Sequence, residues 1–162
     1  MPLELVTVKM LLNLNVTSTV VTASREISAP ADKIFELIAD PALQPQWDGN
    51  ENLAEAPTGQ RVRTVGDVFT MRLTEGSDRT NHVIEFEEGR LIAWLPSEPG
   101  KPPPGHLWRW RLEPLDGSHT LVIHTYDWSG LTDEKRLPRA RATTADRLLA
   151  SIERLAALAE RS

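Results

Sequence analysis

The strongest constraint on the fold of this chain is a run of short alternating segments between residues 67 and 128, each bounded by turn residues. Asp116-Gly117 lies between two such segments, and Asp-Gly flanked by alternating apolar residues is a strong signal for a tight hairpin. The predicted strands cover 67–74, 79–87, 91–96, 107–113 and 120–128. The turns Glu75-Gly76-Ser77-Asp78 and Glu88-Gly89 join the first three of them. This pattern predicts an antiparallel meander.

The simplest closure of each turn predicts which side chains share a face, because side chains alternate along a strand. The face predicted to point inward carries Phe69, Met71, Leu73, Thr80, His82, Ile84, Phe86, Leu91, Ala93, Leu95, Trp108, Trp110, Leu112, Leu121, Ile123 and Thr125. The opposite face carries Arg72, Glu85, Arg109, Arg111, Glu113 and His124. The first set is mostly apolar, so we expect it to enclose the core. A slip of one residue in any hairpin would reverse its part of this assignment.

The segment before the meander predicts one strand and two short helices. Residues 16–27 are rich in Val and Thr and predict a long first strand. Ser28-Ala29-Pro30 opens a helix, with Ser28 or Ala29 at the cap, and Asp40-Pro41 ends it. A second helix over 42–47 and a short edge strand near Leu53 follow. This segment therefore leads from one strand back to the edge of a sheet.

The last part of the chain predicts a long amphipathic helix from Pro138 to Glu160. At 1.5 Å per residue it would be roughly 34 Å long, enough to cross a whole sheet. Its apolar stripe consists of Ala145, Leu148, Leu149, Ile152, Leu155, Ala156 and Ala159. Arg139, Arg141 and Arg147 are balanced by nearby acidic residues and predict a solvated face. The elements together predict an α+β fold: a curved antiparallel sheet of about six to seven strands wrapped around this helix.

Length and composition narrow the functional classes. A chain of 162 residues fits one domain, which we assign to 16–162, with 1–15 as an N-terminal extension of undetermined role. The net charge of −5 argues against nucleic acid or anionic membrane as a partner, and no stretch is apolar enough for stable membrane insertion. The absence of cysteine suits a cytoplasmic protein. No cofactor or metal motif is present, and we expect a monomer or homodimer.

Two stretches resemble a known superfamily. The segment from Arg25 to Pro41, with Ile27-Ser28-Ala29-Pro30 followed by Ile34-Phe35, Asp40-Pro41 and then Trp47, resembles the opening of the START-like (Bet v 1-like) superfamily. The branch concerned contains polyketide cyclases/dehydrases and lipid-transport proteins. Residues 110–117 resemble its penultimate strand and turn, although Gly117-Ser118-His119-Thr120 replaces the Gly-Gly-Thr of many relatives. The resemblance covers about 16–160. It implies a helix-grip fold with a cavity between the sheet and the last helix.

Aromatic residues dominate the predicted cavity. The residues expected to bind a ligand are Trp47, Phe69, Met71, Thr80, Ile84, Phe86, Trp108, Trp110, Ile123 and Thr125. Trp108 and Trp110 would supply broad apolar walls, or would fill the cavity as core residues. The prolines of 97–105 form either a stiff rim of the pocket or a solvated connector.

His82 and Asp127 are the candidates for catalysis. An inward imidazole at His82 could exchange a proton near neutral pH, with Asp127 orienting it, or could be a hydrogen-bonded core histidine. Three functions follow for this chain. The first is binding of a small hydrophobic or aromatic, polyketide- or lipid-like molecule, and the second is a polyketide aromatase/cyclase using His82. The third is a protein-partner module resembling the chaperone activators.

Overall fold

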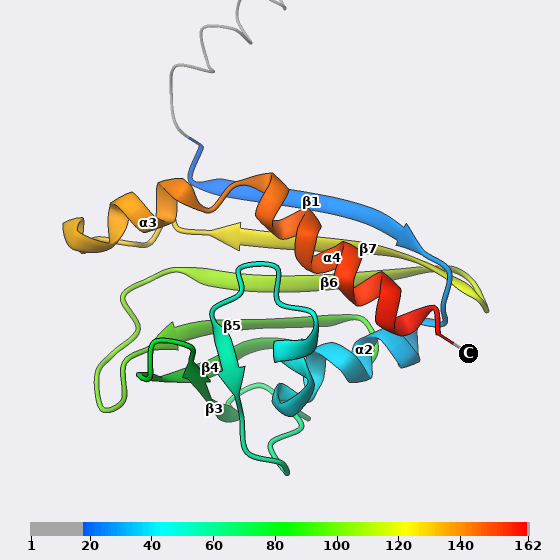
Figure 1. The fold of residues 1–162 in the computed structure, drawn as a ribbon, viewed down its shortest axis with the longest axis horizontal. Coiled ribbons are helices and arrows are strands. Elements are labelled where there is room, and N and C mark those ends of the chain that lie inside the picture. The colour runs from blue at the N-terminus through cyan, green and yellow to red at the C-terminus, as the bar shows by residue number, and fades with distance from the viewer. Residues whose placement is uncertain (1–17, 162) are drawn as a thin grey trace, which may run out of the picture.

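The structure, a computed structural model, describes residues 18–161 (Figure 1). The predicted extension over 1–15 and the first residues of the predicted first strand lie outside the described residues. The strands are β1 (Val20–Ile27), β2 (Leu53–Glu55), β3 (Val68–Leu73), β4 (Asp78–Glu87), β5 (Leu91–Ser97), β6 (Leu107–Asp116) and β7 (His119–Asp127). The helices are α2 (Ala31–Ala39), α3 (Leu137–Ala142) and α4 (Ala145–Ala159), with short 3-10 helices η1 (Pro41–Gln46) and η2 (Glu134–Arg136). None of the described helices is long and apolar enough to cross a membrane.

The seven strands form one antiparallel sheet in the order β1-β7-β6-β5-β4-β3-β2. The sheet curves around α4, which crosses its inner face and packs against β1, β7 and α2 (Figure 1). Ile152 and Leu155 of α4 are fully buried in the main core cluster with Trp110 of β6. The predicted α+β fold, a curved antiparallel sheet around a C-terminal helix, is confirmed.

The inward face of β6 agrees with the sequence, and that of β7 does not. Trp110 and Leu112 are buried as predicted, but Trp110 pairs with His124 rather than with Ile123. The cause is a bulge between Pro114 and Asp116, which adds one residue to β6 and shifts the register. His124 therefore points inward, and the predicted inward positions of Leu121, Ile123 and Thr125 are wrong.

Turn lengths that differ by one residue from the predicted closures reverse most of β4 and β5. The Leu73 N–H donates to the Ser77 carbonyl at 2.8 Å across the first turn, and Glu87 pairs with Leu91 across the second. Phe69, Met71 and Leu73 of β3 are buried as predicted, but Phe69 pairs with Asn81 and Val68 pairs with His82. The inward residues of β4 are therefore Asn81 and Val83, so the predicted inward positions of Thr80 and His82 are wrong. A bulge at Ile84 adds one residue to β4, so Phe86 returns to the inner face and packs against the core as predicted. In β5 the inward residues are Ile92 and Trp94, and not Leu91, Ala93 and Leu95.

Ala93 is fully buried although it lies on the outer face of the sheet. It pairs with Glu85 on one side and with Arg109 on the other. The Arg109 guanidinium donates two hydrogen bonds to the Glu85 carboxylate, each 2.7 Å, across this small residue. The hydrogen bonds from Arg109 lower the pKa of Glu85, and the ion pair shields the outer surface of the sheet at its centre.

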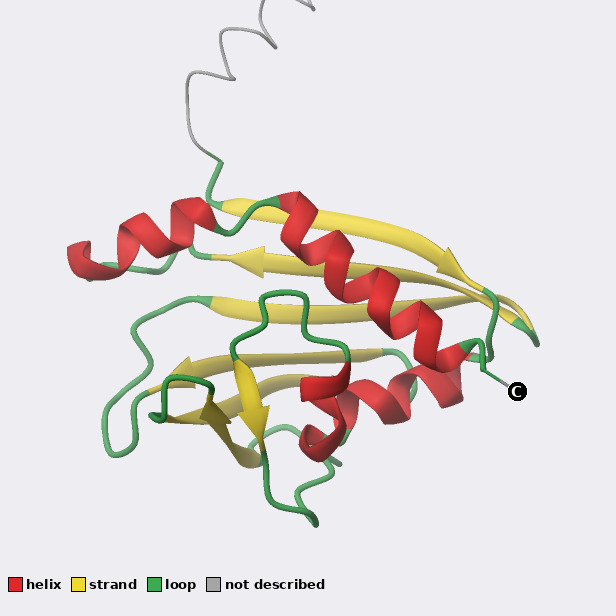
Figure 2. Cartoon of the chain, in the orientation of Figure 1, coloured by secondary structure: helices red, strands yellow, loops and turns green. Residues whose placement is uncertain are grey.

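The predicted C-terminal helix is interrupted. Thr143 and Thr144 have extended backbone angles and separate α3 from α4, as Figure 2 shows. Two adjacent β-branched residues favour such a break, and the Thr143 hydroxyl donates to the Arg139 carbonyl at 3.0 Å, which completes the end of α3. The single helix predicted from Pro138 to Glu160 is therefore two helices, of which α4 carries the core-forming stripe.

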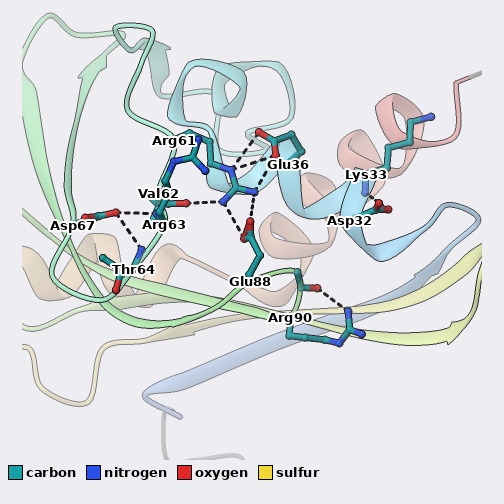
Figure 3. A network of polar contacts seen from close by, with 11 residues as sticks. Asp32, Lys33, Glu36, Arg61, Val62, Arg63, Thr64, Asp67, Glu88 and Arg90 are labelled. Carbon is teal, nitrogen blue, oxygen red and sulfur yellow. Dashed lines mark hydrogen bonds and ion pairs between the residues drawn. The ribbon is translucent and has the colours of Figure 1, made fainter.

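Arg61 ties the loop before β3 to α2 (Figure 3). Its guanidinium contacts Glu36 and Glu88, each at 2.9 Å, and donates to the Val62 carbonyl at 2.6 Å. It also lies 5.5 Å from the centre of the Phe35 ring. The Arg61 side chain is only 15% exposed, whereas its partners Glu36 and Glu88 are 53% and 61% exposed, so the guanidinium is the buried centre of this group of contacts.

We expect Arg61→Met to lower the free energy of unfolding by about 2 kcal/mol, because two partly buried ion pairs and a backbone hydrogen bond are lost together. Urea denaturation followed by circular dichroism measures the change. Arg63→Met is the matched control: Arg63 is exposed, and its side chain makes no hydrogen bond to a described residue, so the loss there should stay below about 0.5 kcal/mol. Equal losses in the two variants would contradict this role of Arg61.

Candidate functional site

A cavity of about 270 Å³ lies between the inner face of the sheet, the loop after η1 and the segments η2, α3 and α4. Its aromatic lining is formed by Trp47, Trp94, His106, Trp108, Trp110, His124 and Tyr126. Its apolar residues are Leu53, Met71, Leu73, Pro96, Leu131 and Ala140. Polar and charged residues make up the rest, so the cavity combines flat aromatic walls with groups that can fix the orientation of a ligand.

His124 is stacked between two tryptophans. Its ring centre lies 3.6 Å from that of Trp110 at an interplanar angle of 12°, and 5.5 Å from that of Trp108 at 18°. Nδ1 donates to the Arg109 carbonyl at 3.0 Å, which leaves Nε2 as the acceptor nitrogen of a neutral ring. Burial lowers the pKa of His124 to about 3, against the weaker opposing effect of this hydrogen bond. The ring is therefore neutral and serves as part of a continuous aromatic wall.

His106 lies at the other end of the same wall, where its ring meets Tyr126 edge-on with centres 6.0 Å apart. Burial, together with the positive charges of Arg136, Arg79 and Arg139, lowers the pKa of His106 to about 4. Burial also raises the pKa of Tyr126. Both groups are therefore uncharged at neutral pH.

The loop after η1 is held in place by backbone hydrogen bonds. The Asp48 carboxylate accepts from the backbone N–H groups of Asn50 at 3.1 Å and Asn52 at 3.0 Å. The Gly49 N–H donates to the Ser151 hydroxyl at 2.8 Å, which joins the loop to α4. The Trp47 indole N–H donates to the Leu37 carbonyl at 2.8 Å, which fixes this part of the wall.

Five cations line the mouth of the cavity: Arg79, Lys135, Arg136, Arg139 and Arg147. Arg136 makes ion pairs with Asp133 at 3.3 Å and with Glu98 at 3.6 Å. Arg139 and Arg147 are exposed, in agreement with the solvated face predicted for this region, and both also line the mouth of the cavity. No residue of the proline-rich loop 97–105 lines the cavity; only the residues on either side of it, Pro96 and His106, do so.

The predicted ligand-binding residues divide into three groups. Trp47, Met71, Trp108 and Trp110 line the cavity. Phe69 and Phe86 lie in the adjacent core, where their rings pack against Trp94 and Phe35 respectively. The remaining four are not in the cavity. Ile84 is the bulged residue of β4, and three lie on the outer face of the sheet: Thr80, Ile123 and Thr125. Ile84 is 41% exposed.

His82 and Asp127, the predicted catalytic pair, are not in the cavity. His82 Nε2 lies 3.0 Å from the Ser97 hydroxyl, which itself donates to the Thr80 carbonyl at 3.1 Å. Nε2 must then be the donor, so this imidazole cannot take the serine proton. Asp127 accepts from the N–H and hydroxyl of Ser129. The proposed proton transfer at His82 required an inward register for β4, which the pairing of Val68 with His82 contradicts.

Several residues of the cavity were not found by sequence reasoning. His124, Tyr126, Asn81 and Trp94 were assigned outward or left out because each lies one residue from the predicted inward position. The signal was present but ambiguous, since both faces of β7 carry large side chains. His106 follows the proline loop, and only the structure brings it to the wall.

Comparison with known proteins gives one family and many similar folds. The profile of the family described as polyketide cyclase / dehydrase and lipid transport matches residues 18–160. The uncharacterized protein Rv0088 of Mycobacterium tuberculosis is 31% identical over 111 residues, which are 67% of this chain and 47% of that protein. The chain thus spans about half the length of the curated relatives it matches.

Solved structures agree on the fold. Protein MLL2253 from Mesorhizobium loti superposes with a TM-score of 0.64 at 20% identity, over 88% of this chain and 98% of that one. The Zhui aromatase/cyclase from a Streptomyces species gives a TM-score of 0.61 at 20% identity, over 88% and 93%. The Aha1 dimer from Colwellia psychrerythraea gives 0.60 at 15% identity, over 87% and 96%. At these identities the similarity shows a shared fold and no shared chemistry.

Proposed function

Because this chain belongs to the polyketide cyclase/dehydrase and lipid transport family, we propose that its cavity binds a small planar aromatic or otherwise hydrophobic molecule. One observation carries the proposal: a cluster of stacked aromatic rings, Trp108, His124 and Trp110, forms one side of a cavity of about 270 Å³. Planar rings pack well on such a surface, and each aromatic pair adds about 1 kcal/mol beyond the area that it buries.

The titration of the two cavity histidines favours binding over acid–base catalysis. A general base works best with a pKa near the working pH. Burial holds the pKa of His124 at about 3 and that of His106 at about 4, so both are weak bases at neutral pH. These lowered pKa values support the two rings as surfaces for a ligand more than as proton carriers.

A titration with 1-anilinonaphthalene, a neutral aromatic dye whose emission increases in apolar surroundings, tests this function. We expect saturable binding to the unmodified protein and about tenfold weaker binding to Trp108→Leu, because one wall of the stack is lost. Trp128→Leu is the matched control. Trp128 packs in the same core cluster as Trp108 but does not line the cavity, so its loss should change the affinity less than about twofold.

Urea denaturation of both variants confirms that each is folded under the conditions of the titration. A linear, unsaturable response of the unmodified protein would overturn the proposed function. Equal weakening by Trp108→Leu and Trp128→Leu would place the dye elsewhere on the protein.

A further inference from the structure

The cavity mouth has a charge opposite to that of the whole protein. The chain has a net charge of −5, yet five of the charged residues that line the cavity are cations and one, Asp48, is a carboxylate. The Asp48 carboxylate can offset only one of the five positive charges, and it is held by backbone N–H groups of its own loop, from Asn52 at 3.0 Å and from Leu53 at 3.2 Å. The positive charge at the mouth is therefore largely uncompensated by the lining itself.

Four of these cations also lack an acidic partner. Among residues 18–161, no carboxylate lies within 4.0 Å of a charged nitrogen of Arg79, Lys135, Arg139 or Arg147. Arg139 does donate to the side-chain oxygen of Asn52 at 2.8 Å when that amide is oriented to accept it, which directs the guanidinium across the mouth. Arginine side chains held in this way are well suited to bind a carboxylate or a similar anion through paired N–H groups.

The cations come from separate parts of the chain and converge on one place. Arg79 lies on β4, Arg136 in η2 and Arg139 on α3. All three line the same cavity as His106, and their positive charges lower the pKa of that imidazole at one end of the aromatic wall. Arg136 is paired with Asp133 and Glu98, so the excess positive charge lies mainly on Arg79 and Arg139, and an anion placed between them would reduce their mutual repulsion.

We infer that the ligand is a planar aromatic anion, whose rings pack against the half-buried Trp108 while its anionic substituent lies between Arg79, Arg136 and Arg139. This inference rests on the proposed function and adds the substrate class to it. The cavity of about 270 Å³ suits a small ring system, and 2-naphthoate is a suitable probe. The aromatic wall then provides affinity for the rings, and the cations provide selectivity for the charge.

Calorimetric titration with 2-naphthoate and with 2-naphthamide, its neutral analogue of nearly the same shape, tests the inference. We expect the naphthoate to bind at least about tenfold more tightly at low salt, since a hydrogen bond to a charged group is stronger than one to a neutral amide. In the double variant Arg79→Gln/Arg139→Gln the ratio of the two affinities should fall to nearly one. The ratio should also fall in the unmodified protein at about 0.5 M salt, because the mouth is open to solvent.

Arg141→Gln is the matched control. Arg141 lies on the same helix as Arg139, is exposed and does not line the cavity, so the substitution removes the same charge without touching the site. We expect it to leave the affinity ratio within about twofold of the unmodified protein. A naphthoate preference that fell equally in Arg141→Gln and in the double variant would overturn the inference.

The outcomes separate this inference from the function on which it rests. Equal binding of naphthoate and naphthamide by the unmodified protein would overturn the anionic class and leave the aromatic cavity standing. Binding of neither probe, with no response to 1-anilinonaphthalene, would overturn both.

Discussion

Replacing Gly105 with alanine is expected to lower the free energy of unfolding by about 4 kcal/mol. Gly105 has φ +121, a backbone angle that residues with a Cβ rarely adopt. An added methyl would also overlap the Gly130 carbonyl, with the carbonyl carbon only 2.6 Å away. Because both obstacles are backbone, neither can be relieved by rotating a side chain. Urea denaturation at neutral pH measures the loss.

Gly100→Ala is the control for this effect. Gly100 lies in the same loop with φ +74, but an added Cβ there meets no atom within 4 Å. It therefore carries the backbone strain without the overlap, and we expect it to cost about 1 kcal/mol. Equal costs at the two positions would mean that the close approach of Gly105 to Gly130 is not important. The approach joins the loop before β6 to the turn after β7, next to His106 and Leu131 of the cavity.

Lowering the pH from 7 to 5 is expected to destabilise the protein by about 4 kcal/mol through His106 and His124. In the unfolded chain both imidazoles titrate near their ordinary pKa of about 6.5. In the folded protein burial lowers the pKa of His106 to about 4 and that of His124 to about 3. Below pH 6.5 the unfolded chain therefore binds protons that the folded one does not. The free energy of unfolding falls with pH until the pH approaches these lowered values.

His106→Gln separates the histidine effect from general acid destabilisation. We expect the variant to lose about half of the pH dependence between pH 7 and pH 5, measured as the difference between its urea unfolding free energies. Exposed His119 is the control. Asp116 raises the pKa of His119 through a hydrogen bond, so protonation of His119 acts in the opposite direction, and His119→Gln should not reduce the slope. The full slope remaining in His106→Gln would contradict the prediction.

Much of the fold was predictable because it depends on local signals. The turns at Gly76, Gly89 and Gly117 gave the meander, and the apolar stripe of residues 145–159 gave the helix that it wraps. Trp108 and Trp110 were placed correctly because β6 begins after an unambiguous loop. The family motif in residues 25–41 agreed with the profile that matches 18–160.

The candidate site was less predictable because it depends on which side chains of each strand point inward. One extra residue in a strand or turn reverses that alternation. A bulge at Ile84 and another beside Leu115 each add one residue to a strand, and nothing in the local sequence marks them. Val122 and Ile123 are equally suited to the core, so the pattern of β7 could not choose between His124 and Thr125 for the inward face. The cationic mouth depends on contacts between distant segments, which periodicity within one helix does not reveal.

The break at Thr143 and Thr144 has a consequence for protein engineering. The helix α4 contributes six buried residues to the fold, whereas α3 contributes only Ala140. Substitutions elsewhere on α3 should therefore change what the cavity selects at little cost in stability. A library restricted to 135, 136 and 139, which all precede the break, would vary the charge at the cavity entrance while leaving α4 unchanged. The two threonines thus divide the C-terminal region into a part that can be redesigned and a part that holds the scaffold together.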